Sequence, residues 1–131
     1  MTINKETTSL NMPWEQEYGY SQAVKVGDTI YLSGQLGHDN KGNVVGIDDM
    51  EMQMRQSYAN IQKVLAHYGA TMDNIVDEVL FVTDMEAAQA AAGKCRQEAF
   101  AGSPVVASTI VQIQCLGLPD ATIEIKCVAK V

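Results

Sequence analysis

The fold is decided by residues 76–102, whose sequence VDEVLFVTDMEAAQAAAGKCRQEAFAG passes directly from a strand pattern into a helix pattern. Residues 76–82 are rich in β-branched and aromatic side chains, which favour a strand. Thr83 stands three residues before Glu86, a capping-box arrangement that predicts the start of a helix. Gly102 and Pro104 predict the end of that helix.

A similar succession of strand and helix precedes this stretch. Residues 21–26 and 29–32 have strand patterns, and Gly27 and Asp28 between them tolerate the positive φ angles of a hairpin turn. Residues 37–46 are dense in turn-forming residues and predict an exposed loop. These features predict a β-hairpin followed by a loop.

A second helix is predicted after the loop. Asp48 stands three residues before Glu51, which repeats the capping pattern, and Gly69 suits the end of a helix. Between them apolar residues recur at helical spacing: Met50, Met54, Tyr58, Ile61, Leu65 and Tyr68.

Two further strands are predicted over residues 109–116 and 122–131, where side chains alternate in character. The whole order predicts an α+β fold with one mixed sheet. Because right-handed helical crossovers join parallel neighbours, both helices are expected on one face of that sheet. The other face is expected to carry a mixture that suits a partly wet subunit interface: Ile110, Gln112, Gln114, Glu124, Lys126 and Val128.

Composition limits the classes of protein that this chain can represent. Its 131 residues, 47% of them hydrophobic, predict a single domain over residues 1–131 with a real core. The net charge of −7 and the absence of adjacent basic residues argue against a nucleic-acid partner. The longest apolar runs are too short to cross a membrane, and the polar start lacks a signal-peptide pattern, so we expect a cytoplasmic protein. The three cysteines are expected to be buried free thiols.

Standard catalytic and metal-binding motifs are absent from the sequence. The two histidines, His38 and His67, lack metal-ligand spacing, so we predict no metal and no cofactor. His38 follows Ser33-Gly34-Gln35 and either lines a site or belongs to an exposed polar loop. Gly34 lies within a strand pattern, where glycine often marks a bulge or the close approach of a ligand. Glu124 also lies within a strand, either paired with Lys126 in solvent or held at an interface.

Several short motifs follow one another along the chain in a specific order and spacing. Together they resemble the RidA (YjgF) family of reactive intermediate deaminases, and the resemblance extends from about residue 18 to the end. They are Tyr20-Ser21-Gln22-Ala23-Val24, Ser33-Gly34-Gln35, Gln56 and Asn60 with Val64-Leu65 and Gly69, Thr83-Asp84-Met85, and Ile123-Glu124-Ile125. The resemblance implies a chorismate-mutase-like (YjgF-type) fold: a mixed sheet with two helices on one face, assembled as a homotrimer around a central barrel. Small-molecule substrates would then bind in clefts between adjacent subunits.

The resemblance also implies roles for individual residues. Glu124 corresponds to the glutamate that positions a water for attack on the imine carbon, after which ammonia leaves and a 2-keto acid remains. Tyr20 and Gly34 correspond to the tyrosine and the strand glycine of the family's pocket. Ser33 joins them as an expected substrate-binding residue.

The sequence departs from the family at the arginine that binds the substrate carboxylate. Ser108 occupies that position, and Ile110 replaces the cysteine that commonly follows two residues later. Because a serine hydroxyl cannot supply the charge of a guanidinium, we expect Ser108 and Thr109 to hydrogen-bond a neutral or differently placed polar group. Ile110 is expected to be a further substrate-binding residue. The predicted function is hydrolytic deamination of reactive enamines or imines with an altered substrate preference. The alternative is a non-catalytic trimeric protein of the same fold that binds a small molecule.

Overall fold

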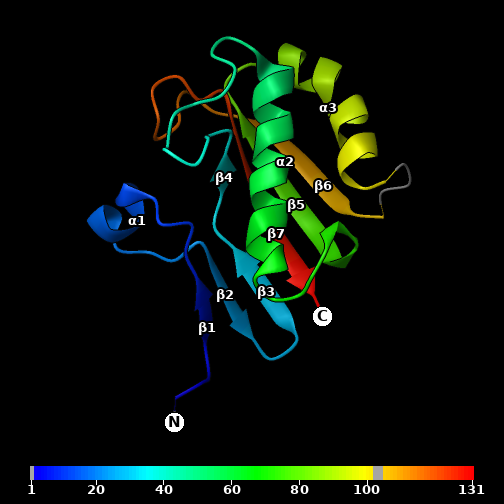
Figure 1. Ribbon diagram of the computed structural model, residues 1–131. Coiled ribbons are helices and arrows are strands. Elements are labelled where there is room, and N and C mark those ends of the chain that lie inside the picture. Colours follow the sequence, from blue (N-terminus) through cyan, green and yellow to red (C-terminus); the bar gives the residue numbers. More distant parts are fainter. Residues whose placement is uncertain (1, 102–104) are drawn as a thin grey trace.

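The computed structural model describes residues 2–101 and 105–131, which fold as one mixed sheet with helices (Figure 1). The helices are α1 (Pro13–Tyr18), α2 (Met50–Ala66) and α3 (Met85–Ala99), with a short 3-10 turn at Met72–Asn74. The strands are β1 (Glu6–Thr8), β2 (Ala23–Val26), β3 (Thr29–Leu32), β4 (Gln35–Leu36), β5 (Ile75–Val82), β6 (Ala107–Gln112) and β7 (Ile123–Lys130). No helix in the described part of the chain is long and apolar enough to cross a membrane.

The strand order in the sheet is β1-β2-β3-β7-β5-β6, and β4 pairs with β7 beside this path. The β5–β6 pair is parallel, as expected for strands joined by α3. The prediction that both crossovers join neighbours is wrong for α2. Both β3 and β5 run antiparallel to β7, which lies between them, so α2 joins parallel strands that do not touch.

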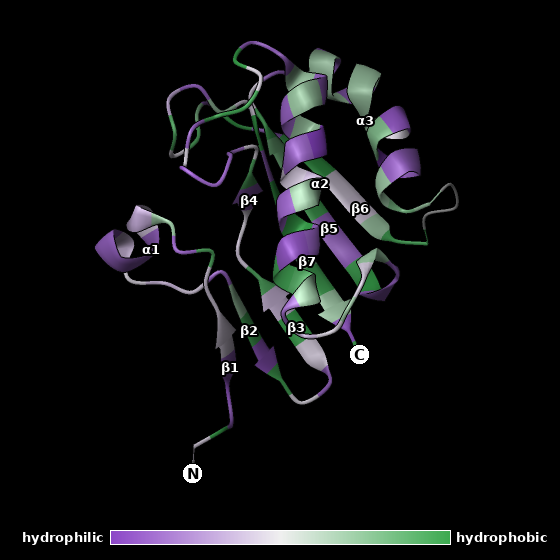
Figure 2. Cartoon of the chain, in the orientation of Figure 1, coloured by the Kyte–Doolittle hydropathy of each residue, from purple (hydrophilic) through white to green (hydrophobic). Residues whose placement is uncertain are grey.

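The two long helices cover the same face of the sheet, as predicted (Figure 1). Green segments along β5 and β7 in Figure 2 mark the apolar residues of these two strands. From these strands the core receives Leu80, Val82, Ile123 and Ile125, and α2 contributes Met54, Ile61 and Leu65. The contribution of α3 is small side chains, Ala88, Ala91, Ala92 and Cys95, which let its backbone lie close to the sheet.

Both long helices begin one residue later than the capping pattern predicts. The N-cap of α2 is Asp49, whose carboxylate accepts the Met52 N–H at 3.0 Å, and Asp48 lies before it in a left-handed conformation. The N-cap of α3 is Asp84 instead of Thr83, and it accepts the Ala87 N–H at 3.1 Å. An aspartate side chain satisfies a free N–H of the first turn in each case. The predicted helix stop at Gly102 and Pro104 lies outside the described residues.

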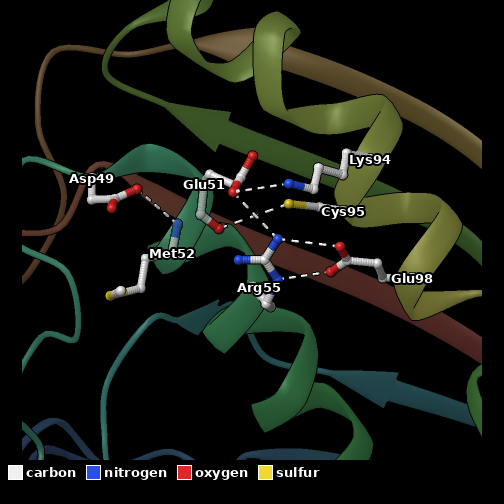
Figure 3. A network of polar contacts seen from close by, with 7 residues as sticks. All are labelled: Asp49, Glu51, Met52, Arg55, Lys94, Cys95 and Glu98. Carbon is white, nitrogen blue, oxygen red and sulfur yellow. Dashed lines mark hydrogen bonds and ion pairs between the residues drawn. The ribbon is translucent and has the colours of Figure 1, made fainter.

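Charged side chains join the outer surfaces of α2 and α3 (Figure 3). Arg55 Nε donates to Glu98 Oε2 at 2.7 Å, and Arg55 Nη2 donates to Glu51 Oε2 at 3.3 Å. Lys94 approaches Glu51 from α3 at 3.6 Å. These ion pairs are exposed to solvent and therefore contribute little to stability. The main attraction between α2 and α3 comes from their buried apolar side chains.

The face of the sheet opposite α2 and α3, which we call the open face, differs from its prediction in β6. Ile110 and Gln112 are in register with Leu80 and Val82, so they lie on the helix-covered face, and Ile110 packs against the core. The open face of β6 carries Thr109 and Val111 instead. A change of one residue in register inverts every side chain of a strand, which is why the alternation alone misplaced them. In β7, Glu124, Lys126 and Val128 lie on the open face, as predicted, and the residues between them are buried on the helix-covered face.

Candidate functional site

A cavity of about 150 Å³ lies where α1, β4 and β7 meet the loop at residues 117–118. Its apolar wall consists of Trp14, Tyr18, Tyr20, Leu36 and Leu118. Its polar wall consists of Gln22, Gln35, His38 and Glu124, together with the backbone at Gly34 and Gly117. The structure thus brings together Tyr20, Gly34 and Glu124 from three separate parts of the sequence.

Gly34 is required by the position of the Glu124 carboxylate. A Cβ atom at residue 34 would collide with the side-chain atoms of Glu124, so only glycine leaves room for the carboxylate there. Burial raises the pKa of Glu124, although Lys126 acts in the opposite direction. A carboxylate with a raised pKa is a better proton acceptor, which is the property required of a general base.

Glu124 also borders a second hollow, of about 310 Å³, on the open face. This hollow is lined by Phe81, Ile113, Cys115, Leu116 and Lys126, and it shares Gly34, Gly117 and Glu124 with the first cavity. The carboxylate therefore stands at the boundary between the cavity of this chain and the uncovered face of its sheet. Cys115 is exposed, whereas Cys95 and Cys127 are buried, so the expectation of buried thiols is wrong for Cys115.

A buried carboxylate holds α1 against the rest of the site. Glu15 Oε2 accepts hydrogen bonds from Leu10 N at 3.1 Å, Met12 N at 2.9 Å and Gln22 Nε2 at 3.0 Å. Burial alone would raise the pKa of Glu15, but the hydrogen bonds outweigh it and lower this pKa. An ionised Glu15 thus fixes the helix that carries Trp14 and Tyr18.

His38 lies in the wall of the cavity, which resolves the two readings left open by the sequence. Its side chain is 4% exposed, and its Nδ1 contacts the Asp39 carbonyl oxygen at 2.8 Å. The ring packs edge-on against Trp14, with 5.0 Å between centroids. His38 is therefore a buried residue of the site and not part of an exposed polar loop.

The remaining predicted site residues lie apart from this cavity. Ser33 Oγ donates to the Ser21 carbonyl oxygen at 2.7 Å, which joins two parts of the chain next to the site. Ser108 Oγ donates to Glu78 Oε2 at 2.6 Å and accepts from Arg96 Nη2 at 2.5 Å on the helix-covered face. Ile110 lies on that same face, and Thr109 lies on the open face. Of the site residues that the family resemblance predicts, the cavity within one chain therefore brings together Tyr20, Gly34 and Glu124.

Trp14, Tyr18, Gln22 and Gln35 line the cavity but were assigned no role from the sequence. The sequence patterns described above predict no helix or strand before residue 21, whereas β1 and α1 form there. Pro13 at the first helical position and Gly19, in the left-handed conformation after the last one, were the signals for α1. The two glutamines belong to the quoted motifs, but their hydrogen bonds are visible only in the folded chain.

Metal-binding geometry is not found at this site or elsewhere in residues 2–101 and 105–131, where no group of three or more His, Cys, Asp or Glu side chains is placed to hold an ion.

Comparison with known proteins identifies the family. The family profile described as Endoribonuclease L-PSP matches residues 12–131. The chain belongs to this YjgF/RidA/Rid family. A RutC family protein, YjgH of Escherichia coli, is 32% identical over 115 residues, which cover 88% of this chain and 85% of that protein. The crystal structure of YyfA, a Rid family protein of unknown function from Yersinia pestis, superposes with a TM-score of 0.86 at 30% identity and covers 98% of this chain and 100% of that one.

One of the similar proteins is a named deaminase. The 2-iminobutanoate/2-iminopropanoate deaminase of Dermatophagoides farinae is 36% identical over 63 residues, so the match spans only 48% of this chain and 49% of that enzyme. The mixed sheet with two helices on one face that the resemblance implies is confirmed for the single chain, with α1 as a third, shorter helix in addition to the two predicted.

Proposed function

We propose that this Rid family protein is a hydrolytic deaminase of reactive imines or enamines, with Glu124 as its general base. The observation that supports the proposal most is the half-buried Glu124 carboxylate, which faces a cavity next to a glycine that leaves room for it. Its raised pKa suits proton abstraction from water. The named deaminase among its relatives supports the same reaction class.

The reaction would add one water to the substrate C=N bond. Glu124 takes a proton from the water as its oxygen bonds to the imine carbon, and the C=N double bond becomes a single bond. With a protonated imine the nitrogen is then a neutral amine, and the proton passes to it from the Glu124 carboxyl. The Glu124 carboxylate next takes the proton of the new hydroxyl group as the C–N bond breaks, which leaves a carbonyl compound and ammonia, and this proton ends on the ammonia as ammonium. Tyr20 stands beside the carboxylate, where burial raises the pKa of its phenol, so its hydroxyl stays neutral and hydrogen-bonds the substrate or the water.

The proposal includes a homotrimer with a small-molecule substrate in each cleft between subunits. The open face supports it, because half-exposed apolar side chains and Glu124 lie together on a surface that no part of the described chain covers. Ser108, Thr109 and Ile110 would approach the cleft from the neighbouring subunit. Because Ser108 replaces an arginine and its hydroxyl is already bonded to Glu78 and Arg96, the substrate preference would differ from that of arginine-bearing relatives.

A second candidate function is binding of a small molecule without catalysis. It is favoured by the same Ser108 contacts, which leave no free cation at the position of the family's arginine. The two functions differ in the role of Glu124.

The test is Glu124→Gln, measured by ammonia release from a panel of 2-imino acids and neutral or cationic imines. In a deaminase this nearly isosteric change removes the base, so turnover at saturating substrate is expected to fall at least about a hundredfold while the protein stays folded. Glu86→Gln, an exposed carboxylate on α3, is the matched control and should leave turnover unchanged. Full activity of folded Glu124→Gln would exclude the mechanism, and no ammonia release by the wild type on the whole panel would favour the binding protein.

A further inference from the structure

The cavity contains a chain of side-chain amides whose direction is set by Glu15. The Glu15 carboxylate can only accept, so Gln22 donates to it through Nε2 at 3.0 Å. Gln22 Oε1 is then free to accept, and it receives Gln35 Nε2 at 2.7 Å. Gln35 Nε2 also donates to the Ser33 carbonyl oxygen at 3.1 Å, which uses both of its hydrogens. The chain therefore ends at Gln35 with an oxygen and not with an N–H group.

That terminal oxygen has no partner in the described part of the chain. Gln35 is 1% exposed, and its Oε1 is buried without a hydrogen bond from residues 2–101 or 105–131. A buried unsatisfied acceptor is costly, and a bound molecule with an N–H group would satisfy it. Gln35 lines the cavity, so a ligand N–H group that reaches this oxygen by a small shift of the surrounding side chains would supply the missing donor.

His38 adds a second acceptor to the same wall. A carbonyl oxygen has no hydrogen to give, so the contact with Asp39 places the proton on His38 Nδ1. In the neutral imidazole this leaves Nε2 as an acceptor. Glu124 supplies two further acceptor oxygens, so the polar wall of the cavity is dominated by groups that receive hydrogen bonds.

The charge and the rings around the cavity favour a cation. Glu124 lines it and the ionised Glu15 lies behind Gln22, whereas no lysine or arginine of the described residues lines it. Three aromatic side chains, Trp14, Tyr18 and Tyr20, form its apolar wall. Aromatic faces attract cations, and an anion would meet both carboxylates, whereas Lys126, the cation that acts on Glu124, lines the hollow on the open face and not this cavity.

We propose that this cavity selects a small organic cation with N–H donors, such as an ammonium or a protonated imine, and rejects carboxylates. A cavity of about 150 Å³ suits a ligand about the size of benzene. The assignment of the cation as a protonated imine rests on the proposed function, whereas the preference for an N–H cation rests on the cavity alone. Together, the proposed function and this cation preference predict that the substrate of this family member is an imine or enamine without a carboxylate.

The test uses three probes that share a tert-butyl group and differ in charge: tert-butylammonium, tert-butanol and pivalate. Trp14 is the single tryptophan of the chain and lines the cavity, so its fluorescence reports binding there. Titrations are made at constant ionic strength and corrected with N-acetyltryptophanamide. Tert-butylammonium is expected to bind at least about tenfold more tightly than pivalate, with tert-butanol between them, because one charge-assisted hydrogen bond has about this effect.

Two variants and one control locate the preference. Glu124→Gln is expected to weaken tert-butylammonium binding about tenfold, and the ratio of the affinities for tert-butylammonium and pivalate is expected to fall. Tyr20 is 40% exposed and therefore tolerant of substitution. Tyr20→Leu is expected to weaken the binding of tert-butylammonium more than the binding of tert-butanol. Glu17→Gln removes an exposed carboxylate on α1 outside the cavity wall and should change the cation affinity about twofold or less. Circular dichroism checks that each variant is folded.

Pivalate binding as tightly as tert-butylammonium would overturn the inference, and so would the absence of any response to the cation. The ammonia assay separates this outcome from failure of the proposed function. If the cation binds preferentially but no imine releases ammonia, the proposed cation site stands and the proposed deaminase function is excluded. If 2-imino acids are deaminated in preference to imines without a carboxylate, the proposed deaminase function stands and the proposed cation selectivity is overturned.

Discussion

At the scale of single residues, Glu78 shows how a buried charge is accommodated beneath α3. Its side chain is fully buried, and it accepts hydrogen bonds from Tyr58 Oη at 2.7 Å, Arg96 Nε at 2.9 Å and Ser108 Oγ at 2.6 Å. Four elements thereby meet at one carboxylate: α2, β5, α3 and β6. Ser108 helps to solvate an internal ion pair, a role that its place in the family pattern did not indicate.

Arg96→Met is expected to destabilise the protein by about 3–5 kcal/mol, because it leaves the Glu78 carboxylate buried without its positive partner. Thermal unfolding measures the loss. Arg55→Met, which breaks an exposed ion pair on the outer surface of α2, should lower the Tm far less. The double variant Glu78→Met/Arg96→Met should recover much of the stability, and a double variant no more stable than Arg96→Met would contradict this explanation.

At the scale of elements, α1 depends on its contacts with the rest of the chain. It has six residues, fewer than an isolated helix needs, and its last turn contains no basic residue. The three hydrogen bonds to Glu15 Oε2 join it to the preceding loop and to Gln22. The position of Trp14 and Tyr18 in the cavity wall therefore depends on the charge of Glu15.

Glu15→Gln is expected to destabilise this region by about 1.5–3 kcal/mol at neutral pH and to shift the fluorescence of Trp14. Because the pKa of Glu15 is lowered in the folded protein, its contribution is complete above the ordinary value of 4.5 and is lost as the pH falls through the folded value. The difference between wild type and variant in urea unfolding should therefore be full at neutral pH and vanish in acid. A difference that persists unchanged in acid would assign the effect to packing and not to charge.

At the scale of the whole molecule, the sheet is covered on one side only. The open face exposes apolar side chains, with Tyr31 at 51% and Val111 at 39%, around Lys126 and Glu124. Such a surface is typical of an interface between subunits. Assembly through it would also enclose the hollow that borders Glu124.

Sedimentation is expected to give three times the chain mass of 14.2 kDa. Val111→Glu places a charge on the open face and should produce a folded species of lower mass, because a buried unpaired carboxylate disfavours the interface. Ile47→Glu, at an exposed loop position that is not in the sheet, is the matched control and should remain assembled. A wild-type monomer at micromolar concentration would exclude the shared cleft and the predicted roles of Thr109 and Ile110 in it.

The sequence by itself determined the features that depend on local patterns. The β-branched and aromatic composition of β5, the alternation in β7 and the helical spacing in α2 each reflect one element that meets an apolar surface, and the structure agrees with all three. The turn at Gly27 reflects the positive φ angle that glycine adopts there. The family motifs drew attention to Tyr20, Gly34 and Glu124, which the fold brings to one cavity. Even the helix starts were displaced by only one residue, because an aspartate stands next to each predicted cap.

Tertiary structure alone decided the features that depend on partners distant in the chain. The register of β6 follows from its hydrogen bonds to β5, so no alternation within β6 could show that Ile110 faces the helices. The insertion of β7 between β3 and β5 likewise joins segments about a hundred residues apart. The direction of the amides from Glu15 through Gln22 to Gln35, and hence the open acceptor in the cavity, exists only once three separate segments have packed together, because a glutamine amide has no fixed orientation until its partners are in place.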